Sequence, residues 1–158
     1  MNNRLLNMRE KYELNQSDIG KIVGVDNTVI CKWKKGIEII PLKHLNTISN
    51  YYNVSMDYLL KLSNEKNYDK YLNINELNKE KMGKRIKIFR QEYNLSLRAL
   101  AKELNTTSST ISAYETGKTI ILTSFAYQIC KKYHISLDWL CGKTEVPLYE
   151  HKTEKVNI

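Results

Sequence analysis

Apolar residues recur every three or four positions along nearly the whole chain, which is the spacing of amphipathic helices and not of strands. In residues 16–23, Ile19 and Ile22 fall on one helical face. Gly24 ends this segment, because glycine adopts a positive φ without steric cost. The pattern then resumes and predicts a second helix at residues 27–35, joined to the first by a tight turn.

The second helix has two unlike faces. Asp26 supplies its N-cap. The residues that can face inward are Val29, Ile30 and Trp33. The opposite stripe consists of Thr28, Cys31, Lys32 and Lys35. Hydroxyl and ammonium groups on one stripe suit a groove that presents base acceptors and phosphates. An ordinary solvated face is the alternative, but turn, cap, apolar face and lysines together favour nucleic-acid contact.

Further helices complete a small unit around this pair. Residues 4–12 form an expected first helix, and Pro41 suits the first turn of a fourth helix that ends at Asn53. Ser55 caps a short fifth helix, with Asp57 in its first turn opposing the positive end of the helix dipole. A core of this size is marginal alone, because so short a chain buries only about 60% of its unfolded surface.

The whole unit returns 81 positions later without a gap. The agreeing pairs include Arg4 and Arg85, Arg9 and Arg90, Leu14 and Leu95, Ile30 and Ile111, Gly36 and Gly117, Tyr52 and Tyr133, and Asp57 and Asp138. Internal repetition at this scale predicts two domains of one fold.

The expected divisions are a first domain at 1–62, a linker at 63–78, a second domain at 79–142 and a C-terminal tail at 143–158. As a flexible chain the linker would span roughly 20–24 Å on average and at most about 53 Å. Adjacent major-groove half-sites lie about 34 Å apart, so one chain could occupy two. The tail is expected to fray, although its apolar patch of Val146, Pro147, Leu148 and Tyr149 could dock on a partner.

The formal charge of +8 is concentrated on the two copies. Residues 1–62 carry +3 and 83–142 carry +5, whereas 63–82 and 143–158 are neutral. A basic surface on folded domains indicates an acidic partner. The three cysteines lack paired spacing, and neither a secretory signal nor a membrane-length apolar run is present. We therefore expect a soluble, cytoplasmic protein with reduced thiols.

Histidine and cysteine residues are scattered without metal-ligand spacing, and no base accompanies the serines of 108–112 in a plausible catalytic arrangement. We expect no metal, no cofactor and no enzymatic activity. The sequence also reveals no effector pocket, so a small-molecule effector stays unknown.

The ordered motifs resemble a known family. The first copy contains Leu14-Asn15-Gln16, Gly24-Val25, Trp33, Gly36 and Ser55-Met56-Asp57-Tyr58-Leu59. The second contains Leu95-Ser96, Leu100-Ala101, Tyr114-Glu115, Gly117-Lys118 and Ser136-Leu137-Asp138-Trp139-Leu140. Together they resemble helix-turn-helix domains of the Cro and phage-repressor type over residues 4–62 and 83–142. The resemblance implies an all-α fold of two tandem five-helix, lambda-repressor-like domains that bind double-stranded DNA and regulate transcription.

In such domains the place of Gln16 anchors a phosphate, and the first turn of the third helix reads bases. Carried over by position, the base readers of the first domain are Asn27, Thr28 and Lys32, with Cys31 beside them. Asn can bond adenine in a bidentate manner, Lys can donate to guanine, and the Thr methyl can pack on thymine. Lys34 and Lys35 are expected to meet phosphates.

The second domain departs from this pattern, because Leu97 replaces the anchoring glutamine. Its reading positions hold Ser108, Ser109, Ser112 and Ala113, which are short and ambiguous readers. Arg98 and Lys118 keep phosphate contact possible. We infer that the first domain supplies more of the specificity, and the second supplies affinity and register.

A charge pair also differs between the copies. Family members often join an arginine of the first helix to a glutamate at the end of the third, and Arg90 with Glu115 preserves this pair. In the first domain Lys34 takes the glutamate position, so Arg9 must find another partner or water. An unpaired buried charge is costly, and we expect the first domain to be the less stable one.

The main hypothesis is a repressor that occludes a promoter, acting as one chain or as a homodimer. The alternative is an antitoxin-like or adaptor-like protein whose second domain mainly binds protein. An RNA role is weaker, because a recognition helix fits the B-form major groove and not the narrow A-form one.

Overall fold

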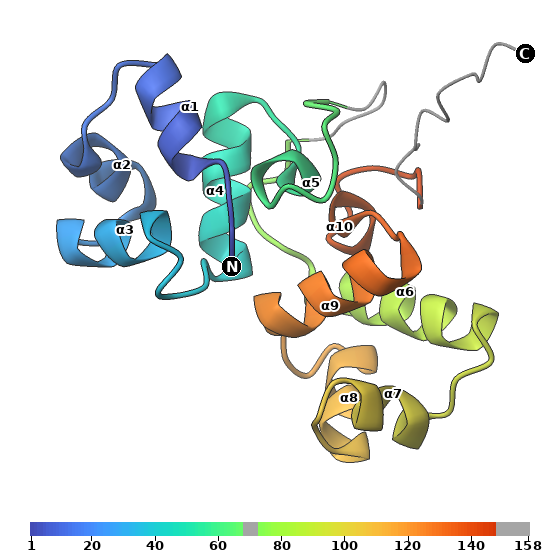
Figure 1. The fold of residues 1–158 in the computed structure, drawn as a ribbon. Coiled ribbons are helices and arrows are strands. Elements are labelled where there is room, and N and C mark those ends of the chain that lie inside the picture. Colours follow the sequence, from blue (N-terminus) through green and yellow to red (C-terminus); the bar gives the residue numbers. More distant parts are fainter. Residues whose placement is uncertain (68–72, 148–158) are drawn as a thin grey trace, which may run out of the picture.

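The structure is a computed structural model that describes residues 1–67 and 73–147 (Figure 1). The first domain comprises α1 (Leu5–Lys11), α2 (Gln16–Val23), α3 (Asn27–Lys34), α4 (Leu42–Tyr52) and α5 (Met56–Leu59). The second comprises α6 (Lys79–Glu92), α7 (Leu97–Glu103), α8 (Ser108–Glu115), α9 (Thr123–Tyr133) and α10 (Leu137–Leu140). The described residues form no strand, so the expected all-α fold with two tandem copies is confirmed.

Local chemistry sets the limits of α2 and α3. Asn15 and Asp18 form a reciprocal capping box at the start of α2, with N–O distances of 2.8 and 2.9 Å. Gly24 ends the helix at φ +74°, in the left-handed region that glycine tolerates. A Cβ at Gly20 would lie 2.6 Å from Val25 O, so only glycine lets the turn fold back onto α2.

Close packing fixes the helix-turn-helix of the second domain on the helix that precedes it. In the second domain, a Cβ at Gly83 of α6 would lie 2.4 Å from Tyr114 O and 2.6 Å from Glu115 O. The backbone of α8 therefore rests directly on α6. Phe89 of α6 and Ile111 of α8 are both buried in this domain.

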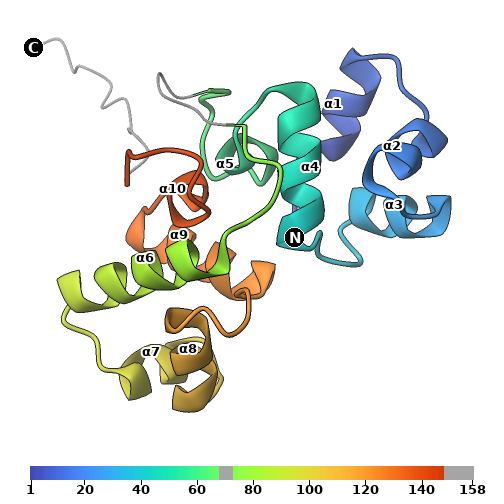
Figure 2. The same ribbon diagram turned by 180° about the vertical axis from the view of Figure 1, so that it is seen from behind.

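The repeat is as regular in structure as in sequence. The last three helices of each domain, α3 to α5 and α8 to α10, begin and end 81 residues apart. Arg4 Nη1 donates to the carbonyls of Tyr58 and Ser63, and Arg85 Nη1 donates to their counterparts in Trp139 and Thr144. The two domains meet at α5 and α10, whereas α3 and α8 lie on the side away from that contact (Figures 1 and 2).

The structure corrects the expectation of a flexible linker and a frayed tail. Ser55 N–H donates to Lys66 O at 2.5 Å, and Ile74 O accepts from the amides of Asn46 and Asn50 at 2.9 and 2.7 Å. Both described ends of the linker are thus attached to the first domain.

The tail behaves in the same way over residues 143–147, so its expected fraying is wrong there. Ser136 N–H donates to Pro147 O at 2.8 Å, the counterpart of the Ser55 contact. Arg85 also binds the carboxylate of Glu145 at 2.9 Å. Of the expected apolar patch, Val146 and Pro147 are described, with Val146 exposed, whereas Leu148 and Tyr149 lie outside the described residues.

Candidate nucleic-acid interface

The expected reading stripe of the first domain lies on the outer face of α3. Asn27 and Thr28 are exposed in its first turn, and Cys31 and Lys32 are half-buried one turn later. Asp26 Oδ1 accepts from the N–H of Thr28 at 2.8 Å, which fixes the start of the helix. The first-turn side chains are therefore presented to solvent on a helix with a defined start.

Two lysines near α3 have partners that the sequence interpretation missed. Lys32 Nζ lies 2.6 Å from Glu38 Oε1, and this hydrogen bond raises the pKa of Lys32. Lys34 Nζ donates to Gln16 Oε1 at 3.3 Å, joining two expected phosphate contacts. Glu38 follows the turn at Gly36, beyond the helical periodicity, so spacing alone gave no signal for it.

The reading face of α8 is smaller. Ser109 is exposed, whereas Ser108 and Ser112 are half-buried. Thr107, the N-cap, has its hydroxyl 3.0 Å from that of Ser109 and 2.8 Å from that of Thr110. Part of this hydroxyl surface is thus engaged within the helix start.

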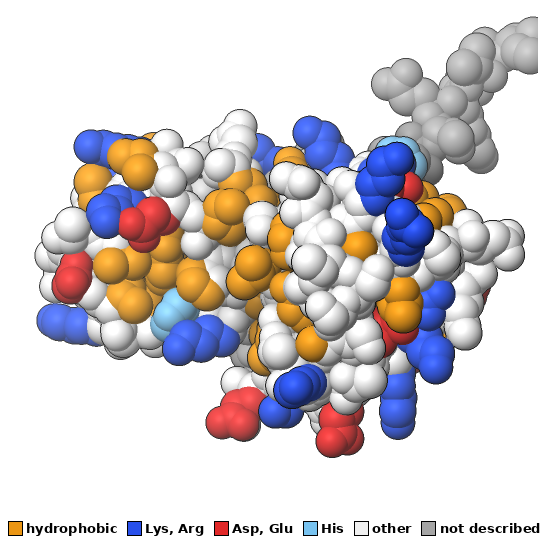
Figure 3. Space-filling model, turned by 90° about the horizontal axis from the view of Figure 1, so that it is seen from below, with side chains coloured by type: hydrophobic (Ala, Val, Ile, Leu, Met, Phe, Trp, Pro, Cys, Tyr) orange, Lys and Arg blue, Asp and Glu red, His pale blue; other side chains and the backbone are white. Residues whose placement is uncertain are grey.

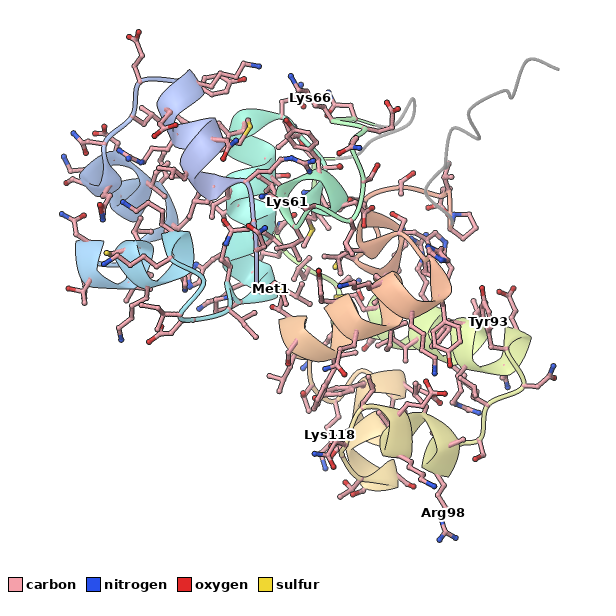
Figure 4. The ribbon with its side chains drawn as sticks, in the orientation of Figure 1. Met1, Lys61, Lys66, Tyr93, Arg98 and Lys118 are labelled. Carbon is pink, nitrogen blue, oxygen red and sulfur yellow. The ribbon has the colours of Figure 1, made fainter. Side chains whose placement is uncertain are left out.

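Two cations flank α8. Arg98 and Lys118 are exposed, and Figure 4 shows both at the lower edge of the second domain, with Arg98 pointing away from its body. Their positions leave the guanidinium and ammonium groups accessible to phosphates.

The arginine–glutamate pair is asymmetric between the domains. Arg90 binds Glu115 through Nε at 2.5 Å and Nη2 at 3.1 Å, and this contact raises the pKa of the arginine. In the first domain, Arg9 Nη1 donates to Leu14 O at 3.0 Å, but Arg9 Nε meets no hydrogen-bond partner within residues 1–67 and 73–147. Lys34, at the glutamate position, instead points to α2.

Comparison with protein families gives a match in each half of the chain. Residues 5–59 match a helix-turn-helix family, and residues 83–146 match a family described as a helix-turn-helix domain. The chain is a tandem helix-turn-helix regulator of the Cro and phage-repressor type. Neither a curated protein nor a solved structure matches it. In the described part of this DNA-binding regulator, no helix has the length and apolarity to cross a membrane.

At the contact between the two domains of the regulator, an aspartate of each domain binds the start of the last helix of the other domain. Asp138 accepts from Met56 N–H and Asp57 N–H, both at 2.9 Å. Asp57 accepts from Leu137 N–H at 2.7 Å and from the Ser136 hydroxyl at 2.6 Å. Both carboxylates are fully buried, and burial with the neighbouring Asp57 raises the pKa of Asp138 well above its ordinary value. Asp57 lies in the first turn of α5 as expected, and its carboxylate in addition caps α10 of the other domain.

An apolar cavity of about 340 Å³ opens between the domains of the regulator. Its walls include Ile39 and Pro41 from the first domain and their counterparts Ile120 and Leu122 from the second. Figure 3, the view from below, shows hydrophobic side chains over the first domain and in the middle of the face, with Lys and Arg side chains around them.

Proposed function

We propose that the regulator binds double-stranded DNA sequence-specifically and represses transcription by occluding a promoter. The observation that carries this proposal is the first turn of α3, where Asn27 and Thr28 stand exposed on a capped helix of a helix-turn-helix domain. A helix of this type lies in the major groove with its N-terminal residues at the base edges. The three free cysteines fit a reducing cytoplasm, where such a protein acts.

The base contacts follow from side-chain chemistry. Asn27 bonds an adenine, Thr28 packs on a thymine methyl, and Lys32 donates to guanine acceptors, each good contact contributing about 1–3 kcal/mol of discrimination. Cys31 lies beside them. On binding, the Lys32 ammonium leaves the Glu38 carboxylate and donates to the base edge. Breaking this ion pair costs little because both side chains are more than 40% exposed.

Phosphate contacts set orientation and affinity. In the first domain they come from Gln16, Lys34 and Lys35, and in the second from Arg98 and Lys118. Because Gln16 and Lys34 already touch, one phosphate can accept from both at the α2–α3 junction.

The second domain makes fewer specific base contacts than the first. Its Ser108, Ser109 and Ser112 are short donors, and the Ser109 hydroxyl is shared with the α8 cap. This observation also favours the alternative, in which the second domain serves chiefly as a module for binding protein and DNA contact rests on the first. Under that alternative, changes at α8 alter complex formation with protein and leave DNA binding unchanged.

The test is selection of bound sequences from a random duplex library, at two salt concentrations. The full chain is compared with a variant carrying Asn27→Ala, Thr28→Ala and Lys32→Ala. Lys66→Ala is the charge control, because Lys66 is exposed and lies at the opposite edge of the molecule from α3 and α8 (Figure 4). We expect a motif that the triple variant loses in one half and the control retains. Binding without an enriched motif, fading equally for all three proteins with salt, would overturn the proposal.

A further inference from the structure

The contact between the domains has the symmetry of a two-fold axis. Asp57 of α5 binds the start of α10, and Asp138 of α10 binds the start of α5. These two aspartates are equivalent, being 81 residues apart. A contact in which residue i meets j while the equivalent of j meets the equivalent of i is isologous, and only a two-fold rotation produces it. A simple translation of one domain onto the other is excluded.

The residues that line the cavity between the domains are consistent with the same two-fold axis. Ile39 and Ile120 are equivalent, as are Pro41 and Leu122, and both members of each pair line the cavity. Since α3 and α8 are also equivalent and both lie on the side away from the α5–α10 contact, the two readers share one side of the molecule in inverted orientation (Figures 1 and 2).

A second set of contacts makes the pairing specific for unlike domains. Lys143 is fully buried, and its ammonium donates to Asn46 Oδ1 at 2.7 Å, Ser49 Oγ at 2.8 Å and Asn50 Oδ1 at 2.9 Å. These acceptors lie on α4 of the first domain.

The counterparts of these groups cannot form the same contact. Leu62 occupies the position of Lys143 in the first domain, and Tyr127, Cys130 and Lys131 occupy the acceptor positions in the second. Two second domains would bring Lys143 against Lys131, and two first domains would bring Leu62 against the polar acceptors. Each like pairing leaves a buried polar group without its partner, so the contact selects a first domain with a second.

We propose that one chain acts as a complete pseudo-dimer whose target is an inverted site with two unlike halves. This proposal rests on the DNA binding proposed above. The first half is read by Asn27, Thr28 and Lys32 and is tightly specified. The second half lies in inverted orientation about 10 base pairs away, centre to centre, and is specified weakly by the serines of α8. The chain binds this site as one protein per duplex.

The first experiment uses the full chain and the selected duplex. Four duplexes carry the two halves inverted, the halves as a direct repeat, the halves inverted with about 5 extra base pairs between them, and the first half repeated as a palindrome. We expect the inverted duplex to bind tightest, with roughly tenfold or greater loss in the direct repeat and in the lengthened duplex, since either change removes one set of base contacts. Equilibrium sedimentation of the complex should give one chain per duplex.

A graft tests the reading assignment separately. Ser108→Asn, Ser109→Thr, Ser112→Cys and Ala113→Lys place the first reader on α8, and the grafted chain should prefer the palindrome over the unlike inverted site. Equal binding to inverted and direct repeats, or two chains per site, would overturn the pseudo-dimer while leaving DNA binding in place. Absence of any enriched sequence is a different result and counts against the proposed function itself.

Discussion

Replacing Asp138 by alanine removes the carboxylate that accepts from Met56 N–H and Asp57 N–H. Both donors then lie in a buried contact with no acceptor, and each such donor costs about 1–3 kcal/mol. Loss of the unfavourable interaction between Asp138 and the neighbouring Asp57 offsets part of this cost. We expect the free energy of unfolding to fall by about 2–4 kcal/mol, a large share of the roughly 5–15 kcal/mol typical of a folded protein.

The tryptophans allow each domain to be followed separately. The chain has two, Trp33 in the first domain and Trp139 in the second, and both are buried. In urea unfolding, the fluorescence of Trp139 in the Trp33→Phe variant reports the second domain, and the fluorescence of Trp33 in the Trp139→Phe variant reports the first. Their transitions should coincide when Asp138 is present, because the two domains unfold together. With Asp138→Ala the first-domain transition should shift to lower urea and separate from the second, since the lost partners cap α5.

Asp18→Ala is the matched control. It removes a carboxylate from a helix start within the first domain, where Asp18 accepts from Asn15 N–H at 2.8 Å. It should lower the free energy of unfolding by about 1 kcal/mol and leave the domains coupled. If Asp138→Ala leaves both midpoints and their coincidence unchanged, the reciprocal caps do not hold the domains together.

Three further outcomes are expected. Lys34→Glu gives Arg9 Nε the partner that it lacks, so the free energy of unfolding should rise by about 1.5–3 kcal/mol in urea unfolding while DNA affinity falls; an unchanged free energy of unfolding would contradict the pairing. Burial and the neighbouring Asp57 raise the pKa of Asp138, so above about pH 4 the folded chain holds a proton that the unfolded chain has lost. The free energy of unfolding should therefore fall as pH rises through the raised pKa, and this dependence on pH should be weaker in Asp138→Asn. An unchanged dependence in that variant would mean that other groups cause it. Arg98→Ala should reduce the slope of log Kd against log salt by about 1, measured by fluorescence anisotropy, and an unaltered slope would remove this residue from the phosphate contacts.

The features that sequence could predict are local. The limits of α2 and the caps at Asp26 and Ser55 depend on residues within three or four positions, where spacing and capping preferences act directly. The lack of a glutamate partner for Arg9 was visible because the second copy supplies an internal comparison. DNA contacts of individual residues stay predictions.

The features that sequence could not predict are contacts between distant segments. Asp57 fits the first turn of its own helix as a charge on the dipole, and nothing in its neighbourhood signals a donor 80 residues away. Lys143 lies in a stretch that resembles a solvated tail, yet it is buried against α4. Periodicity describes one face of one element, whereas these side chains depend on how two completed domains pack.

Placing both helix-turn-helix units in one polypeptide alters how occupancy of a site responds to the amount of protein. A regulator assembled from separate subunits dissociates on dilution, so at low concentration its active form varies as the square of the total. Here the partner domain is present at the fixed effective concentration set by the tether. For the proposed pseudo-dimer, occupancy at low concentration then follows the first power of the protein level. Halving the dose halves the active species, without a threshold below which the switch is lost.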